Sequence, residues 1–142
     1  MEETATPLQE EYNILLESFK RSRADYLNLE KRVSDERALI IKYANENLII
    51  KLLPIVDALE EAVKKEKVDG VKLILKDFIQ LLSDLGVSEI KATGETFDPS
   101  FHEAVDVTSG EENKVMQVVR KGYTLNGKVL RPARVLVGKL IV

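Results

Sequence analysis

The stretch that decides the fold runs from Leu8 to Ile50 and reads LQEEYNILLESFKRSRADYLNLEKRVSDERALIIKYANENLII. Steps of four and three residues alternate along it, and ten of the thirteen positions that they reach are apolar or aromatic. This seven-residue period predicts a helix that packs lengthwise on another helix in a left-handed seam. At about 1.5 Å per residue the helix would be roughly 65 Å long. Because the rest of the sequence offers nothing to cover it, we expect a parallel homodimer.

Most of the dimer contacts are expected along this seam. Three seam positions, Ser22, Glu36 and Asn47, are polar, and they either fix the register of the paired helices or weaken the seam so that it unwinds with heat. The residues expected to form the dimer, including two from the segment that follows the seam, are Leu15, Phe19, Tyr26, Leu29, Val33, Ile40, Tyr43, Ile50, Phe78 and Leu82.

Breaker residues divide the chain into three segments. All seven glycines lie at or after Gly70, and we expect Pro54 to kink or restart the helix that precedes it. Residues 54–86 then read as a helical hairpin that turns at Val68–Gly70 and ends at Gly86, a glycine well placed as a helix cap. The second helix is apolar nearly all round, which predicts a four-helix bundle when two chains meet. The domains expected are a dimerisation helix over 1–53, the hairpin over 54–86 and a β-rich domain over 87–142.

The third segment has the short apolar runs and turn residues of a small β domain. Asn126-Gly127 is a strong signal for a tight hairpin turn. About 56 residues make a small core, so we expect this β sandwich or barrel to dock on the helical bundle. The fold class is therefore α+β. The strands expected are Val87–Ala92, His102–Thr108, Lys114–Tyr123, Lys128–Leu130 and Arg134–Ile141.

The last strands indicate an interaction surface. From Asn113 onward the chain has seven basic residues and no acidic one, interleaved with aliphatic side chains. An apolar patch with a basic rim is typical of a protein–protein interface. A nucleic-acid surface would add exposed aromatic side chains or a basic recognition helix, and only Tyr123 is present, so nucleic acid is the less favoured partner. The third interpretation is that the aliphatic residues are core and the basic ones a solvated face.

Composition excludes most familiar catalytic sites. The 142 residues include no cysteine and one histidine, His102, so disulfides, thiol nucleophiles and multi-histidine metal sites are excluded. Adjacent residues point to opposite faces of a strand, so His102 is expected to be a hydrogen-bonded structural residue rather than the acid–base partner of Glu103. We expect no enzyme activity, cofactor or metal. The start, Met1–Thr4, does not resemble a signal peptide and no apolar run is long enough to span a membrane, so we expect a cytoplasmic protein.

A series of ordered motifs resembles those of a known family, the GrpE nucleotide exchange factors of DnaK-type chaperones. A helix motif over 24–32 (ADYLNLEKR) is followed by a helix-break motif over 52–60 (LLPIVDALE). Gly86-Val87 and the run 97–105 (FDPSFHEAV) come next, and the most specific match is 121–135 (KGYTLNGKVLRPARV). The resemblance covers roughly residues 20–142.

The resemblance implies a homodimer in which one β domain binds the ATPase domain of a DnaK-type chaperone, opens its nucleotide cleft and accelerates ADP release. It also implies that Gly70 matches a glycine in the hairpin turn whose replacement misplaces the β domain. The alternative function is a coiled-coil scaffold or nucleic-acid-associated dimer that uses the basic C-terminal strands. By position, the chaperone contacts implied are Phe97, Pro99, Val119, Lys128 and Val137.

Overall fold

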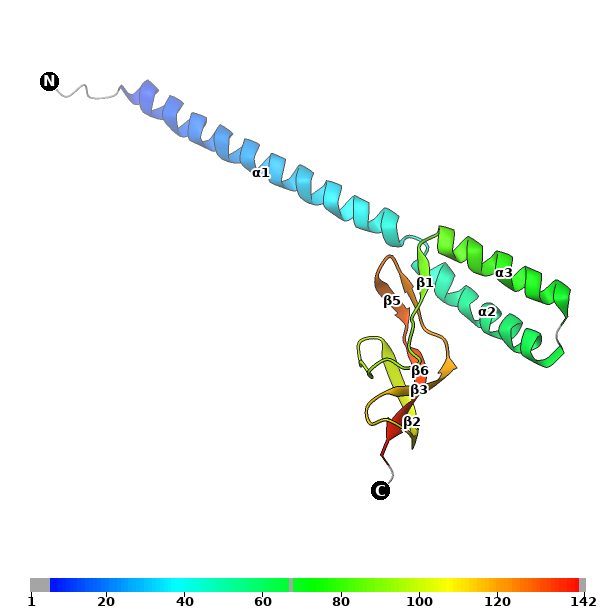
Figure 1. Ribbon diagram of the computed structural model, residues 1–142. Coiled ribbons are helices and arrows are strands. Elements are labelled where there is room, and N and C mark those ends of the chain that lie inside the picture. The colour runs from blue at the N-terminus through cyan, green and yellow to red at the C-terminus, as the bar shows by residue number, and fades with distance from the viewer. Residues whose placement is uncertain (1–5, 67, 141–142) are drawn as a thin grey trace. The chain divides into compact units, whose positions relative to one another are not determined.

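The computed structural model describes residues 6–66 and 68–140, and it divides the chain into two units between Lys42 and Tyr43. We call the described residues up to Lys42 the arm and those from Tyr43 onward the body. Helices come first and strands follow, which confirms the α+β class (Figure 1). In the described part of the chain no helix is both long and apolar enough to cross a membrane. Met1–Thr4 and the expected last strand residue, Ile141, lie outside the described residues.

The first helix, α1, spans Pro7–Tyr43 and contains 37 residues. Its apolar side chains face solvent, and none of its residues, all within the described part of the chain, is buried. The chain then turns at Ala44 and Asn45 before α2 begins at Glu46. Asparagine is a weak helix former because its side chain competes for backbone hydrogen bonds, which suits a break here.

The expectation that the helix restarts at Pro54 is wrong. α2 runs without interruption over Glu46–Glu66, with Pro54 inside it. Proline removes one hydrogen bond from the helix ladder. Leu53 and Val56, on either side of Pro54, have no exposed surface, so tertiary packing holds the backbone helical at this point.

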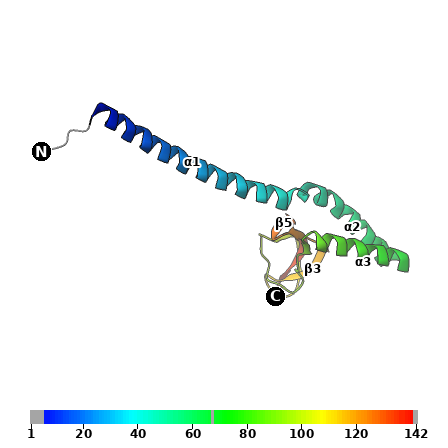
Figure 2. The same cartoon turned by 90° about the horizontal axis from the view of Figure 1, so that it is seen from above.

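Helix α3 spans Asp69–Asp84 and packs antiparallel against α2, as expected for a hairpin (Figure 2). It ends where predicted. Gly86 has a φ of +91°, and its N–H donates a 3.0 Å hydrogen bond to the carbonyl of Ser83. A left-handed residue just after a helix is the usual role of a glycine cap. A Cβ here would lie 2.3 Å from Asn126 Oδ1, so a larger residue would also have to displace the Asn126 side chain.

The strands form two three-stranded sheets. The first has the order β1-β4-β5 and is antiparallel; the second has the order β2-β6-β3, with β6 parallel to β2 and antiparallel to β3. Asn126 and Gly127 both have positive φ and join β4 to β5, which confirms the predicted tight turn. The strands are β1 Val87–Glu89, β2 His102–Ser109, β3 Val115–Arg120, β4 Tyr123–Leu125, β5 Lys128–Arg131 and β6 Ala133–Lys139.

The strand predicted over Lys114–Tyr123 is two strands in different sheets. The chain leaves β3 and enters β4 at Lys121 and Gly122. A Cβ on Gly122 would lie 2.3 Å from the backbone nitrogen of Ala133, so the two segments that join the sheets cross in close contact. This close approach requires glycine. It also ends β3 before Gly122, although the alternating sequence pattern continues past that point.

The body has two cores. One joins Ile49, Leu53 and Val56 of α2 and Leu82 of α3 to the first sheet through Val87, Tyr123 and Leu125. The β region therefore docks on its own helical hairpin, as its small size predicted. The second core lies around the second sheet and comprises Ile90, Ala92, Val115, Ala133, Val135 and Val137.

Candidate functional site

His102 has a structural position. Its side chain is 6% exposed, and Nδ1 accepts a 3.0 Å hydrogen bond from the backbone N–H of Asp98. The Phe97 ring lies 6.0 Å away between centroids, while Glu103 is exposed. This confirms the hydrogen-bonded role over acid–base catalysis. Over residues 6–66 and 68–140, no group of three or more His, Asp or Glu side chains could hold a metal ion.

Phe97 and Pro99 belong to one tight loop, but at different depths. Asp98 organises this loop, because its carboxylate accepts the N–H of Ser100 at 2.9 Å and its carbonyl accepts the N–H of His102 at 2.8 Å. Phe97 is half-buried against the second core, whereas Pro99 is exposed. Of the two, Pro99 is the residue that the loop exposes to solvent.

Val119 and Val137 also lie at different depths. Val137, on the central strand β6, is 9% exposed and belongs to the second core, paired with Val115 on one side and Val107 on the other. Val119, on β3, is 55% exposed. It lines a surface groove together with Val118, Arg120, Lys121 and Arg134. Of the aliphatic residues expected in the apolar patch, Val119 is therefore exposed, whereas Val137 is buried.

Most of the basic residues predicted to form the rim pair with acidic residues of this chain. The rim was expected from Arg120, Lys121, Lys128, Arg131, Arg134 and Lys139, and four of these six have acidic partners. Because charges that already have a partner are poor phosphate ligands, the arrangement weakens the nucleic-acid hypothesis. The pairs are Lys121 with Glu60 and Glu89, Lys128 with Glu46, Arg131 with Asp57, and Arg134 with Glu103.

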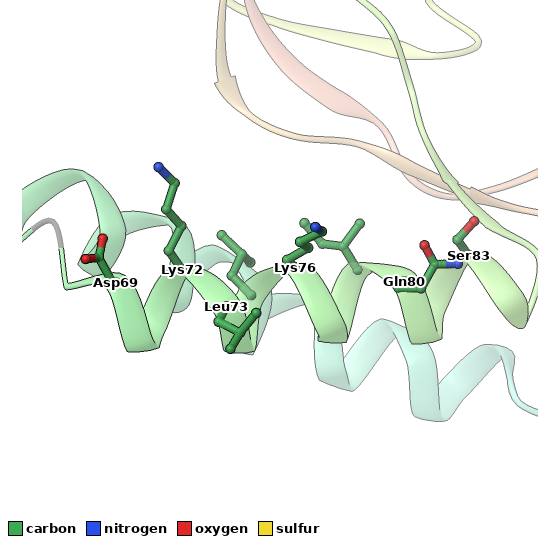
Figure 3. A pocket seen from close by; sticks show the side chains of 8 residues that line it. Asp69, Lys72, Leu73, Lys76, Gln80 and Ser83 are labelled. Carbon is green, nitrogen blue, oxygen red and sulfur yellow. The ribbon is translucent and has the colours of Figure 1, made fainter.

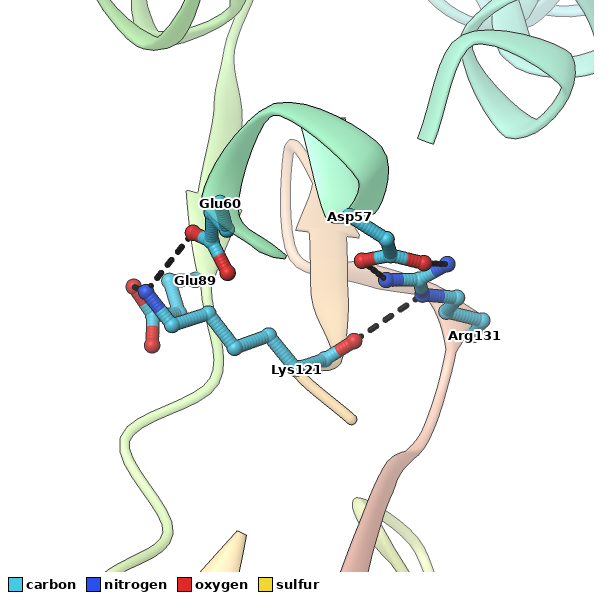
Figure 4. A network of polar contacts seen from close by, with 5 residues as sticks. All are labelled: Asp57, Glu60, Glu89, Lys121 and Arg131. Atoms are coloured by element: carbon cyan, nitrogen blue, oxygen red, sulfur yellow. Dashed lines mark hydrogen bonds and ion pairs between the residues drawn. The ribbon is translucent and has the colours of Figure 1, made fainter. Parts of the chain in front are cut away.

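Arg131 is at the centre of the best-defined of these contacts (Figure 4). Its two terminal nitrogens donate to both carboxylate oxygens of Asp57, at 2.7 and 2.5 Å, and Nε donates to the carbonyl of Lys121 at 2.9 Å. The guanidinium also lies 5.5 Å from the centroid of the Tyr123 ring. Fork-shaped pairing of this kind is available to arginine alone among the basic side chains.

Lys121 continues the network about one turn further along the same face of α2. Its Nζ donates to Glu60 at 2.9 Å and lies 3.6 Å from Glu89. Burial lowers the pKa of Lys121, but the hydrogen bond and charge of Glu60, with those of Glu89, outweigh burial and leave the pKa above its usual value. The charged form of Lys121 is thus stabilised.

Lys128 already has a place within the body. Its Nζ donates to Glu46 Oε2 at 2.8 Å and lies 5.3 Å from the centroid of the Tyr43 ring. The resemblance assigns Lys128 to the chaperone contact. In this chain it also joins the start of β5 to the start of α2.

The residues expected at the dimer interface fall into two groups. Six on α1 are 46–69% exposed, and Ile50 on α2 is 36% exposed. Leu82, by contrast, is buried in the first core, and Tyr43 and Phe78 pack against that core. The six exposed positions on α1 are Leu15, Phe19, Tyr26, Leu29, Val33 and Ile40.

A further apolar surface lies along α3 (Figure 3). Leu73, Leu75 and Ile79 line a groove there, with Lys72 and Lys76 along it. The residues expected at the dimer interface do not include these positions, although the apolar character of this helix all round is a signal for them. This groove is the face of the hairpin that a bundle partner would cover.

Gly70 lies in the first turn of α3, so the connection assigned to Val68–Gly70 ends earlier, where α3 begins at Asp69. A Cβ on Gly70 would meet nothing within 4 Å. Neither space nor a left-handed conformation therefore requires glycine at this position.

Comparison with known proteins identifies the family. The GrpE family model matches residues 1–139. Protein GrpE of Thermoplasma volcanium is 41% identical over 124 residues, covering 87% of this chain and 70% of that protein. Protein GrpE of Brachyspira hyodysenteriae is 39% identical, covering 93% and 72%, and that of Lactobacillus johnsonii is 37% identical, covering 88% and 71%. The chain therefore belongs to the GrpE family of co-chaperone nucleotide exchange factors.

Proposed function

We propose that this chain acts as a homodimer that binds the ATPase domain of a DnaK-type chaperone, opens its nucleotide cleft and accelerates ADP release. The observation that carries the proposal is the match of the family model to residues 1–139. No bond is made or broken by this protein in such a role. It would act by binding the open cleft more tightly than the closed one, and each tenfold preference shifts the opening equilibrium by about 1.4 kcal/mol.

The surface that we propose for the chaperone contact comprises the five residues implied by the resemblance, in three roles. Pro99 and Val119 are exposed and would touch the chaperone directly. Val137 belongs to the second core and Phe97 packs against it, so these two would hold the surface in shape. Lys128 would exchange Glu46 for a carboxylate of the chaperone.

The exposed apolar face of α1 supports the homodimer. Burying six such side chains is worth on the order of 10–20 kcal/mol as an upper bound. Most of the stability of a helix in a protein comes from packing of its amphipathic face rather than from helix propensity. The same seven-residue period on a second copy would cover the seam along its whole length.

Sedimentation tests the dimer. At micromolar concentration the chain is expected to sediment as an elongated dimer, and replacing Leu29 and Val33 by aspartate is expected to yield monomers. A compact monomer of the unsubstituted chain would contradict the proposal.

Exchange itself is tested by stopped-flow release of a fluorescent ADP analogue from the chaperone. A release rate that is unchanged by this protein would overturn the proposed function.

A further inference from the structure

Three acidic residues lie on one face of α2 and pair with three basic residues of the first sheet and the segment that enters it. Glu46, Asp57 and Glu60 are 11 and 3 residues apart, close to whole helical turns, so they share the face that carries the buried Leu53 and Val56. Their partners are Lys128, Arg131 and Lys121 respectively.

Arg131 has the most contacts of the three basic residues. Its side chain is only 11% exposed, it holds both oxygens of Asp57, and it lies against the Tyr123 ring. Its Nε reaches the carbonyl of Lys121, ten residues earlier in the chain. One side chain thus ties two strand connections to α2.

Those two connections both run between the two sheets. The chain passes from the second sheet to the first at Lys121–Gly122, and returns from the first to the second between Arg131 and Ala133. The Asp57–Arg131–Lys121 contact therefore holds both crossing points against the helix (Figure 4). The second sheet, which carries Val119, continues directly from these points.

We propose that Arg131 is a positioning residue for nucleotide exchange, because its fork on Asp57 and Lys121 sets the angle of the second sheet on α2. This inference rests on the proposed function. The hydrophobic first core attaches the first sheet to the hairpin, but apolar contacts are non-directional. Paired hydrogen bonds on a planar fork have a defined direction, so they can fix an angle that packing alone leaves free.

Substitutions on either side of the contact test this role. Arg131→Gln and Asp57→Asn each remove the fork, and each is expected to lower the acceleration of ADP release about tenfold at subsaturating concentration. Because the two residues act through one contact, the double variant is expected to lose no more than either single variant. Arg131→Lys keeps the charge without the fork and is expected to lose nearly as much.

A matched control removes a cation from an ion pair that does not join the sheets to α2. Lys114 pairs with Glu111, three residues away in the same loop, so Lys114→Gln is expected to leave exchange unchanged. Circular dichroism and thermal unfolding then show whether each variant is folded. The Asp57→Asn variant keeps the test decisive if Arg131→Gln does not fold.

Spin-label distances separate positioning from direct contact. The chain has no cysteine, so labels at Lys65→Cys on α2 and Gln117→Cys on β3 can be introduced without background, in dimers diluted with unlabelled chain. We expect a single narrow distance distribution that broadens or shifts in Arg131→Gln and Asp57→Asn but not in Lys114→Gln. An unchanged distribution in both fork variants overturns the proposal, and so does a broadened one with full exchange activity. If the unsubstituted chain fails to accelerate ADP release, the proposed function fails, while the distances still show whether Arg131 fixes the sheet.

Discussion

Lys128 Nζ donates a 2.8 Å hydrogen bond to Glu46 Oε2, which joins β5 to the first turn of α2 across 82 positions of sequence. Lys128 is also the charged residue that we propose for the chaperone contact. The Lys128 ammonium cannot hold both Glu46 and a carboxylate of the chaperone at full strength. The ion pair within the chain and the one with the chaperone therefore compete. The Lys128 side chain is 53% exposed, which makes the internal pair weak enough to exchange.

Removing the carboxylate of Glu46 should therefore favour binding of the chaperone by Lys128. Glu46→Gln is expected to raise the affinity for the chaperone ATPase domain about two- to fivefold, the equivalent of ~0.5–1 kcal/mol for a partly exposed ion pair. Lys128→Gln is expected to lower it. Titration calorimetry measures both, with Glu17→Gln as the control because Glu17 pairs with nearby Lys20 on α1 and is not among the residues that line the groove at Val119. Weaker binding by Glu46→Gln would show that Lys128 stays with Glu46 in the complex.

Val119 and Val107 provide a matched pair of exposed valines. They are 55% and 61% exposed on the two edge strands of the second sheet. Val119→Asp is expected to reduce chaperone binding at least tenfold because it places a charge in an apolar contact, while the melting temperature stays nearly unchanged. Val107→Asp should bind normally. Equal losses in the two variants would move the interface away from Val119.

Val137→Asp should behave differently from Val119→Asp. Val137 belongs to the second core, so an aspartate there would be a buried, unpaired charge. We expect destabilisation of the body by more than about 3 kcal/mol, seen as an early unfolding transition. Loss of chaperone binding would then accompany loss of the fold, and the dimer formed through α1 should persist. A stably folded Val137→Asp body would contradict its place in the core.

Gly70→Ala is expected to be neutral or stabilising. The position lies in the first turn of α3 with open space around it, and alanine in a helix is favoured over glycine by about 0.5–1 kcal/mol. Denaturant unfolding measures this difference. The resemblance implies instead that replacing this glycine misplaces the β domain, so a loss of stability or of exchange would favour that role.

The body should lose stability at high pH. Burial, together with the negative charges of Glu60 and Glu89, raises the pKa of Tyr123 above its ordinary value of 10.0. The unfolded chain then releases this proton more readily than the folded one, so stability is full below pH 10 and falls as pH rises through that value. The raised pKa of Lys121 acts in the same direction. Melting temperatures between pH 9 and 11.5 should fall less steeply for Tyr123→Phe, and identical slopes would contradict the buried phenol.

The periodic parts of the fold could be predicted from the sequence. The seven-residue period of α1, the glycine cap at Gly86 and the turn at Asn126-Gly127 are local signals, each carried by residues close together in the chain. The break after Tyr43 carries neither glycine nor proline, and its one local signal is Asn45, a weak helix former. Pro54 is held in a helix by buried neighbours, so that outcome depended on tertiary packing.

The polar contacts of the body could not be predicted in the same way. Arg131 and Asp57 are 74 positions apart, and nothing local distinguishes a basic residue on a solvated rim from one that pairs with a helix. The end of β3 did have a signal in Gly122, whose backbone contact with Ala133 interrupts an otherwise continuous alternating pattern.

ADP release tests the central claim most directly. A DnaK-type chaperone loaded with a fluorescent ADP analogue is mixed with excess unlabelled nucleotide and increasing amounts of this protein in a stopped-flow instrument. The account predicts a release rate that rises and saturates with the dimer concentration, a response lost in Val119→Asp and kept in Val107→Asp. A release rate that stays at its unassisted value at saturating dimer would contradict it.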